Sequence, residues 1–163
     1  MTKVLIDSFD RQFQILDRRA REIVRHTPDE KLYWQPRLID ALFPVNSCGE
    51  YVLRSAGAVE QTFGGLTTKL WDDPFEWTLP EALSTAAAVL NYLDEVEETR
   101  RKGFALLQSD EDLRREIPAP EKLKTIFALL LETLARAENF QGRALAIFRE
   151  FSDEKIKTGW SFL

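Results

Sequence analysis

Cysteine and histidine are nearly missing from this sequence of 163 residues, which has one of each. A single cysteine cannot form a disulfide within the chain, and one histidine cannot complete a three-histidine metal site. Long apolar runs are missing too, since no uncharged run approaches the ~20 residues that a membrane span requires. Together with Asp7 and Asp10, which lie where a signal peptide would be apolar, these absences predict a cytoplasmic protein without a membrane partner.

Positive charge is also in short supply. Lys and Arg number 22 against 27 Asp and Glu, which gives a net charge of -5 and a pI near 5.1. Nucleic-acid binding depends on clustered cations that displace counterions, so we expect neither DNA nor RNA as a partner. The length suits one domain over residues 1–163, which can bury about two-thirds of its unfolded surface.

Apolar residues recur in steps of three and four along four segments, which is the period of a helix with one buried stripe. The predicted helices span roughly residues 3–26, 48–70, 80–108 and 121–153. Ser109 to Asp112 predicts a further short turn. The seven prolines all lie in connectors or in first helical turns, which favours an all-α four-helix bundle over any sheet.

Local signals mark the helix ends. Thr27–Glu30 and Ser47–Glu50 both have the capping-box pattern, which predicts a short helix through about Tyr33 and the start of the second long helix. Gly64 and Gly65 lie near the end of that second helix and weaken it. Either the helix loosens there or another backbone approaches closely, and we favour close packing.

Three short motifs carry a resemblance to a known family. They are Leu-Tyr-Trp-Gln-Pro at Leu32–Pro36, Ser-x-Gly-Glu at Ser47–Glu50, and Ala-Glu-Asn-Phe-Gln at Ala137–Gln141. With four long helices in this order, the chain resembles the DinB-like superfamily over nearly its whole length. The resemblance implies a four-helix bundle with a long crossover connection and short extra helices, and it implies a homodimer.

Many DinB-like members are regarded as metal-dependent enzymes, including thiol-dependent transferases and isomerases. The resemblance implies one histidine ligand from the second helix and a His-x-x-x-His pair from the last, because residues four apart share one helical face. The matching positions here are Arg54, Ala137 and Gln141. Ala137 has no donor atom and Arg54 would repel a metal ion, so we expect no metal and no cofactor. A helical wheel puts Ser55 nearer the core than Arg54, which leaves the register at this position open.

Gln141 lies on the apolar stripe of the last helix, and a buried amide needs hydrogen-bond partners. We expect it to meet Arg54 or Glu138 as a polar plug in the former metal cavity, with Trp34 as a further candidate for the lining of that cavity. The alternative is that Gln141 tilts toward solvent at the edge of the stripe. The stripe consists of Phe127, Leu130, Leu134, Ala137, Gln141, Ala144 and Phe148.

Two residues with reactive side chains favour structural roles. We expect Cys48 to be only a small structural residue in the first turn of a helix. A cysteine at that position needs nearby cations before its thiol becomes a nucleophile. His26 lies at the end of the first helix, where an imidazolium interacts favourably with the helix dipole.

Three functions are left open by the sequence. The favoured one is a metal-free DinB-like protein whose cavity binds a small molecule or nothing. The second is a metal- or thiol-dependent transferase or hydrolase with a rebuilt site drawn from Glu50, Glu60, Glu138 and Gln141. The third is a protein-interaction module that uses apolar helix faces and the aromatic, acidic loop 71–77, whose three carboxylates are also a weaker candidate for holding a cation.

Overall fold

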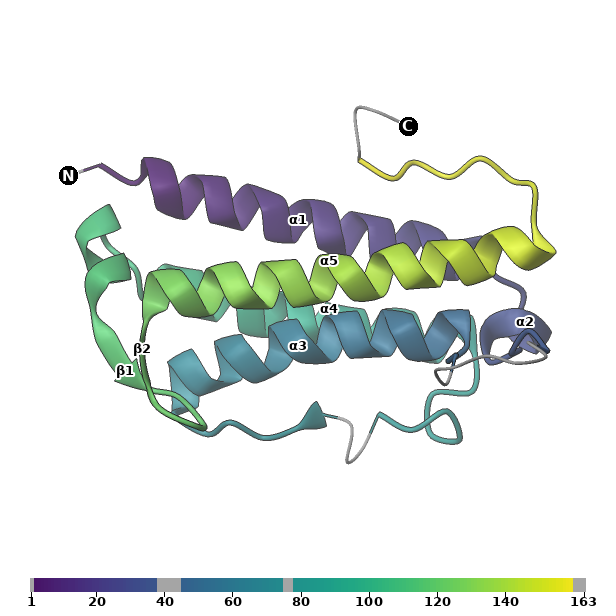
Figure 1. The fold of residues 1–163 in the computed structure, drawn as a ribbon, viewed down its shortest axis with the longest axis horizontal. Coiled ribbons are helices and arrows are strands. Elements are labelled where there is room, and N and C mark those ends of the chain that lie inside the picture. The colour runs from purple at the N-terminus through teal and green to yellow at the C-terminus, as the bar shows by residue number, and fades with distance from the viewer. Residues whose placement is uncertain (1, 38–44, 75–77, 160–163) are drawn as a thin grey trace.

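The computed structural model of the chain describes residues 2–37, 45–74 and 78–159 (Figure 1). The all-α prediction is confirmed, because helices dominate and the described strands are two of three residues each. None of the described helices is both long and apolar enough to cross a membrane. The elements are α1 (Val4–Arg25), α2 (Asp29–Leu32), α3 (Cys48–Thr68), α4 (Ala86–Ala105), the 3₁₀ helix η2 (Asp110–Arg114), β1 (Glu116–Pro118), β2 (Leu123–Thr125) and α5 (Ile126–Phe151).

The four long helices form a bundle in which α1 packs on α4 and α5, and α3 packs on the same two helices from the other side. Figure 1 shows that α1 and α5 run in one direction, whereas α3 and α4 run in the opposite direction. Because α3 and α4 are parallel, the chain between them returns along the length of the bundle. This is a long crossover connection of the kind that the resemblance implied.

Apolar stripes fill the interior of the bundle. All six residues of the α1 stripe are buried: Ile6, Phe9, Phe13, Leu16, Ala20 and Ile23. The rings of Phe13, Phe63 and Phe104 form a central cluster, with ring centroids 4.9 to 5.9 Å apart. The predicted stripe of α5 contains one wrong residue. Phe127 is 40% exposed and packs edge-on against Phe9 at the end of the bundle.

The predicted start of the third long helix near residue 80 is wrong. Residues 80–85 form turns and bends, and α4 begins at Ala86. The Ala88 N–H donates to Thr85 Oγ1 at 3.2 Å, which caps the helix at this later point.

The predicted start of the last helix near residue 121 is also wrong. Leu123–Thr125 pair with Glu116–Pro118 in an antiparallel two-stranded sheet, and α5 begins only at Ile126. Thr125 accepts a hydrogen bond from the Ala128 N–H at 3.1 Å and so caps α5. The strand pairing uses backbone groups that the longer predicted helix would have needed.

The two predicted capping boxes have different outcomes. At α3, the Glu50 N–H donates to Ser47 Oγ at 3.2 Å and the Ser47 N–H donates to Glu50 Oε2 at 2.9 Å, which confirms the first. At Thr27 the prediction is wrong, because its hydroxyl donates backward to the Ile23 carbonyl at 2.7 Å. The short helix α2 therefore begins at Asp29 without a side-chain cap.

Neighbouring glycines of α3 have different surroundings. A Cβ on Gly65 would lie 2.4 Å from the Trp71 ring, whereas a Cβ on Gly64 would have its nearest neighbour, the Leu70 carbonyl, at 3.9 Å. Close packing is present at Gly65, but the neighbour is the side-chain ring of Trp71 and not the predicted second backbone.

These surroundings predict opposite effects of alanine. Gly64→Ala should raise the free energy of unfolding by about 0.5–1 kcal/mol, because alanine loses less backbone entropy in a helix. Gly65→Ala should lower it by about 1–3 kcal/mol through overpacking against Trp71. Urea denaturation of the two variants measures both, and equal stabilities would contradict the assigned contact.

Candidate functional site

Gln141 is buried on α5, with 2% of its surface exposed, so the solvent-edge alternative is wrong. Its Nε2 donates to the Leu16 carbonyl at 2.8 Å, and its Oε1 accepts a hydrogen bond from Arg19 Nη1 at 3.1 Å. Both ends of the amide are therefore satisfied by α1.

Arg19 is the cation of this cluster and is 1% exposed. Its Nη1 lies 2.6 Å from Glu138 Oε2, and its Nε donates to the Thr158 carbonyl. We call Arg19, Glu138 and Gln141 the Arg19 cluster. The sequence predicted Arg54 or Glu138 as the partner of Gln141. The hydrogen bonds described for the Gln141 amide instead come from Arg19 and go to Leu16, and Arg19 also holds Glu138.

The sequence contains a signal that Arg19 is buried. Arg19 lies three residues after Leu16 and four before Ile23, so it occupies the buried stripe of α1. A charged side chain on such a stripe must be paired when the helix packs.

Ser55, and not Arg54, faces α5 from α3. Ser55 is 1% exposed, and its Oγ donates to the Ala137 carbonyl at 3.0 Å, whereas Arg54 is only partly buried. The helical-wheel prediction that Ser55 lies nearer the core than Arg54 is confirmed. Ser55, Ala137 and Gln141 therefore stand closest to the three ligand positions that the resemblance implies.

These side chains do not fit a divalent metal. Ala137 has no donor, and the Gln141 oxygen already accepts a hydrogen bond from the buried Arg19 cation. Among residues 2–37, 45–74 and 78–159, no group of three His, Cys, Asp or Glu side chains is placed to hold a metal ion.

A small cavity lies between the helices beside Ser55 and Gln141. Its volume is about 20 Å³, which is enough for roughly one water molecule. This cavity is therefore too small for an organic ligand.

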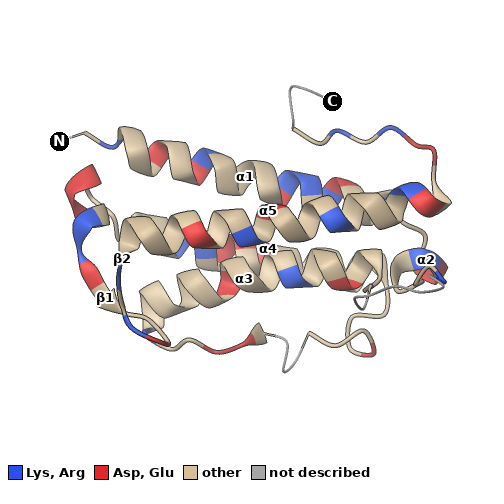
Figure 2. Cartoon of the chain, viewed as in Figure 1, with Lys and Arg blue, Asp and Glu red and all other residues tan. Residues whose placement is uncertain are grey.

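A larger opening lies on the outer side of Arg19, between α1 and the segment that follows α5. This opening, which we call the Arg19 cleft, has a volume of about 490 Å³. Figure 2 shows Lys and Arg on the C-terminal half of α1 and on the segment beyond α5. The cleft is lined by Ile15, Arg18, Arg19, Arg21, Glu22, Arg25, Lys157, Thr158 and Gly159.

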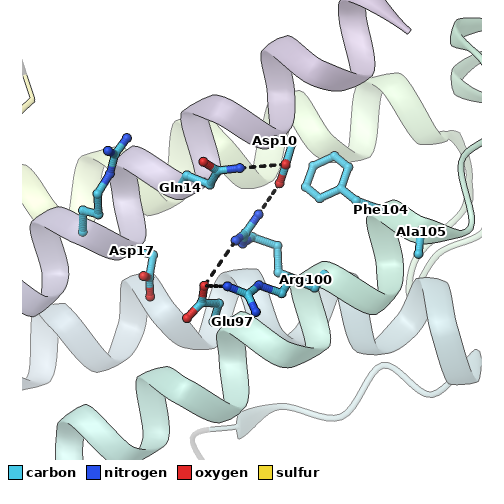
Figure 3. A pocket seen from close by; sticks show the side chains of 9 residues that line it. Asp10, Gln14, Asp17, Glu97, Arg100, Phe104 and Ala105 are labelled. Carbon is cyan, nitrogen blue, oxygen red and sulfur yellow. Dashed lines mark hydrogen bonds and ion pairs between the residues drawn. The ribbon is translucent and has the colours of Figure 1, made fainter.

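A second groove, of about 460 Å³, separates α1 from α4 (Figure 3). Apart from Arg18, which also lines the Arg19 cleft, its charged side chains are paired with oppositely charged residues. The Arg100 guanidinium forms an ion pair with Asp10, and Glu97 lies 2.6 Å from Arg101 and 3.9 Å from Arg100. This pairing joins the two helices and leaves little charge for a ligand, so we assign the groove a structural role.

The acids of the predicted rebuilt site are not brought together. Glu50 caps α3, Glu60 lies ten residues further along it, about 15 Å away, and Glu138 pairs with Arg19. Glu60 accepts a hydrogen bond from the Tyr92 hydroxyl at 2.5 Å, and burial raises the pKa of its carboxyl although this bond opposes the shift.

Trp34 lies away from the Arg19 cluster. Its ring packs edge-on against Phe151, ten residues beyond Gln141 on α5. In the acidic loop, Asp72 and Asp73 are exposed, and the third carboxylate, at position 76, falls outside the described residues.

Cys48 and His26 have structural surroundings. Cys48 is fully buried, and burial raises the pKa of its thiol to about 12 despite an opposing hydrogen bond from Thr27. His26 Nδ1 lies 2.8 Å from the Glu22 carbonyl at the end of α1, as the helix-end interpretation expected.

The raised pKa predicts that the Cys48 thiol is unreactive in the native protein. At pH 8 only about one thiol in 10⁴ would be ionised, and the thiolate is the form that reacts. Labelling with a disulfide reagent should be at least about 100-fold slower in the native protein than in guanidinium chloride. Rapid native labelling would contradict both the burial and the raised pKa.

Comparison with known proteins adds no relative. No family model, curated protein or solved structure matches this chain. The DinB-like resemblance stays a prediction, and the candidate site rests on the Arg19 cluster and the cleft beside it.

Proposed function

We propose that this chain is a DinB-like bundle in which the Arg19 cluster replaces the metal site and the Arg19 cleft binds a small molecule. The observation that carries the proposal is the position of Arg19. Its guanidinium lies against Gln141, at one of the expected ligand positions, and its Nε reaches the Thr158 carbonyl in the wall of the cleft.

The size of the cleft supports a small-molecule ligand. Its volume of about 490 Å³ falls within the roughly 300–1,000 Å³ that is usual for ligand pockets. A rebuilt carboxylate enzyme has less support, since Glu138 is held by Arg19 and Glu50 by the α3 cap.

Metal analysis tests the first half of this proposal. We expect less than about 0.1 equivalent of metal after incubation with zinc, nickel or manganese, and no rise in melting temperature, since only a ligand of the native state stabilises it. Stoichiometric metal with a stabilising shift would overturn the proposal and favour the enzyme hypothesis.

An NMR fragment screen tests the second half. Ligands should shift the amide signals of Ile15 and Gly159, which line the cleft, and leave those of Gly64, at the far end of α3, unchanged. A screen that perturbs no cleft residue would count against small-molecule binding.

Self-association is a second candidate function, favoured by exposed apolar side chains at one end of the bundle. Phe9 and Phe127 join α1 to α5 there, and the Leu5 N–H donates to the Asp110 carboxylate at 3.1 Å, which brings η2 alongside. We propose that a second copy of the chain covers this surface. The exposed residues are Val4, Leu5, Leu106, Leu123, Phe127 and Leu131.

Light scattering coupled to size exclusion tests this proposal. The protein should elute as a dimer, and Leu131→Glu should convert it to a monomer because a charge cannot be buried unpaired in the contact. Leu79→Glu, at a similarly exposed leucine outside this set, is the matched control and should stay dimeric. A monomeric wild type at high concentration would refute the proposal.

A further inference from the structure

The cations of the Arg19 cleft fall into two groups. Arg19 is held by Glu138, and Arg21 is held by Asp17 at 2.8 Å and Asp94 at 2.6 Å. These two charges are compensated by acids of α1, α4 and α5. Their guanidinium groups build the wall of the cleft.

The other group faces the opening. Within the part of the chain that the structure describes, Arg18 and Lys157 have no ion-pair partner, and both are exposed. They belong to opposite walls, since Arg18 lies on α1 and Lys157 lies beyond α5. Arg25 adds a third cation, which Glu22, the only acid among the described residues of the lining, approaches at 3.6 Å. The lining therefore keeps an excess of positive charge in a chain whose net charge is -5.

The second wall is fixed in place against α1. Ile156 is buried, and Arg19 holds the Thr158 carbonyl. Gly159 has a φ of 75°, and a Cβ there would lie 2.8 Å from Ile15 Cγ2. Glycine is therefore required for both the backbone conformation and the close approach, which makes the cleft a built feature with an aliphatic side chain in its lining.

We infer that the Arg19 cleft binds a small organic anion, with its carboxylate or phosphate between Arg18 and Lys157 and its apolar part against Ile15. This inference rests on the proposed small-molecule function and specifies the ligand class. Guanidinium groups bind carboxylates and phosphates through paired charge-assisted hydrogen bonds, and an ammonium group adds a point charge. The carbon stems of Arg18 and Lys157 extend the apolar surface.

Titration calorimetry of the full chain with four eight-carbon probes tests the ligand class. Octanoate or octyl phosphate should bind measurably, and octylammonium should not bind. Octanol, which has the same apolar part without charge, should bind at least about tenfold more weakly than the better anion. Comparison of octanoate with octyl phosphate decides which anionic group the cleft prefers.

Charge-neutralising variants locate the anion. Arg18→Gln and Lys157→Gln should each weaken binding of the better anion by about three- to fivefold, because each removes one exposed charge interaction. Arg11→Gln on α1 and Lys155→Gln beyond α5 are matched controls, since both residues are exposed and outside the lining. The controls should change affinity less than about twofold.

Two outcomes overturn the inference in different ways. If octanol binds as tightly as the anions, or if the Arg18 and Lys157 variants bind as the controls do, the ligand class is wrong while small-molecule binding stands. If none of the four probes binds and the fragment screen perturbs no cleft residue, both the inference and the small-molecule proposal fail.

Discussion

Glu138→Gln is expected to lower the free energy of unfolding by about 3 kcal/mol, because it removes the carboxylate charge that holds the buried Arg19 guanidinium. Arg19 is 1% exposed and cannot turn to water, whereas the side chain of Glu138 is 29% exposed. The cost therefore comes mainly from the cation that stays behind.

The double variant Arg19→Met/Glu138→Gln should recover most of this loss and unfold within about 1 kcal/mol of the wild type, since no unpaired charge is left. Urea denaturation of the single and double variants completes the cycle. Arg18→Gln, at the exposed neighbouring position, is the control and should stay within about 0.5 kcal/mol. A double variant whose loss equals the sum of the losses of Glu138→Gln and Arg19→Met would show that the pair is not coupled.

Phe63→Ala is expected to lower the free energy of unfolding by about 3–5 kcal/mol, because it leaves a cavity at the centre of the bundle. Phe63 is fully buried. The centroid of its ring lies 5.2 Å from that of Phe13 and 4.9 Å from that of Phe104. Gly103 lies directly beneath it, where a Cβ would come within 2.4 Å of the ring.

Phe127→Ala provides the comparison for this substitution. Phe127 also has an aromatic neighbour, Phe9, but 40% of its surface is exposed, so its loss should cost about 1 kcal/mol or less. Chemical denaturation of both variants gives the two values. Similar losses at the two positions would place the main aromatic core elsewhere.

The parts of the fold that could be predicted depend on local signals. The buried stripe of α1 and the Ser47 cap of α3 are contained within a few turns of sequence, and both are present in the structure. The starts of α4 and α5 were predicted less accurately. The α5 start depends on Leu123–Thr125 pairing with residues 116–118, and such pairing is a tertiary choice that overrides helical periodicity.

Only two of the three residues of the Arg19 cluster could be predicted from the sequence. Gln141 was predicted because a polar group on a buried helical face needs partners, and Glu138 because it lies in the segment that carries the family resemblance. Arg19, however, lies 119 residues from Glu138 in sequence. No spacing rule connects two residues so far apart. The choice between Arg54 and Ser55 has a simpler cause. Neighbouring residues on a helix point about 100° apart, so only one of the two side chains can face α5.

The parallel arrangement of α1 and α5 has a consequence for synthesis on the ribosome. Helix α1 has α5 as one of its main neighbours, so the buried face of α1 stays incomplete until α5 has been synthesised. At about 5–20 residues per second, the 119 residues that separate Arg19 from Glu138 take about 6–24 s to add. During that interval Glu138 is not yet present, and a chain stalled before Glu138 cannot neutralise Arg19 with that carboxylate.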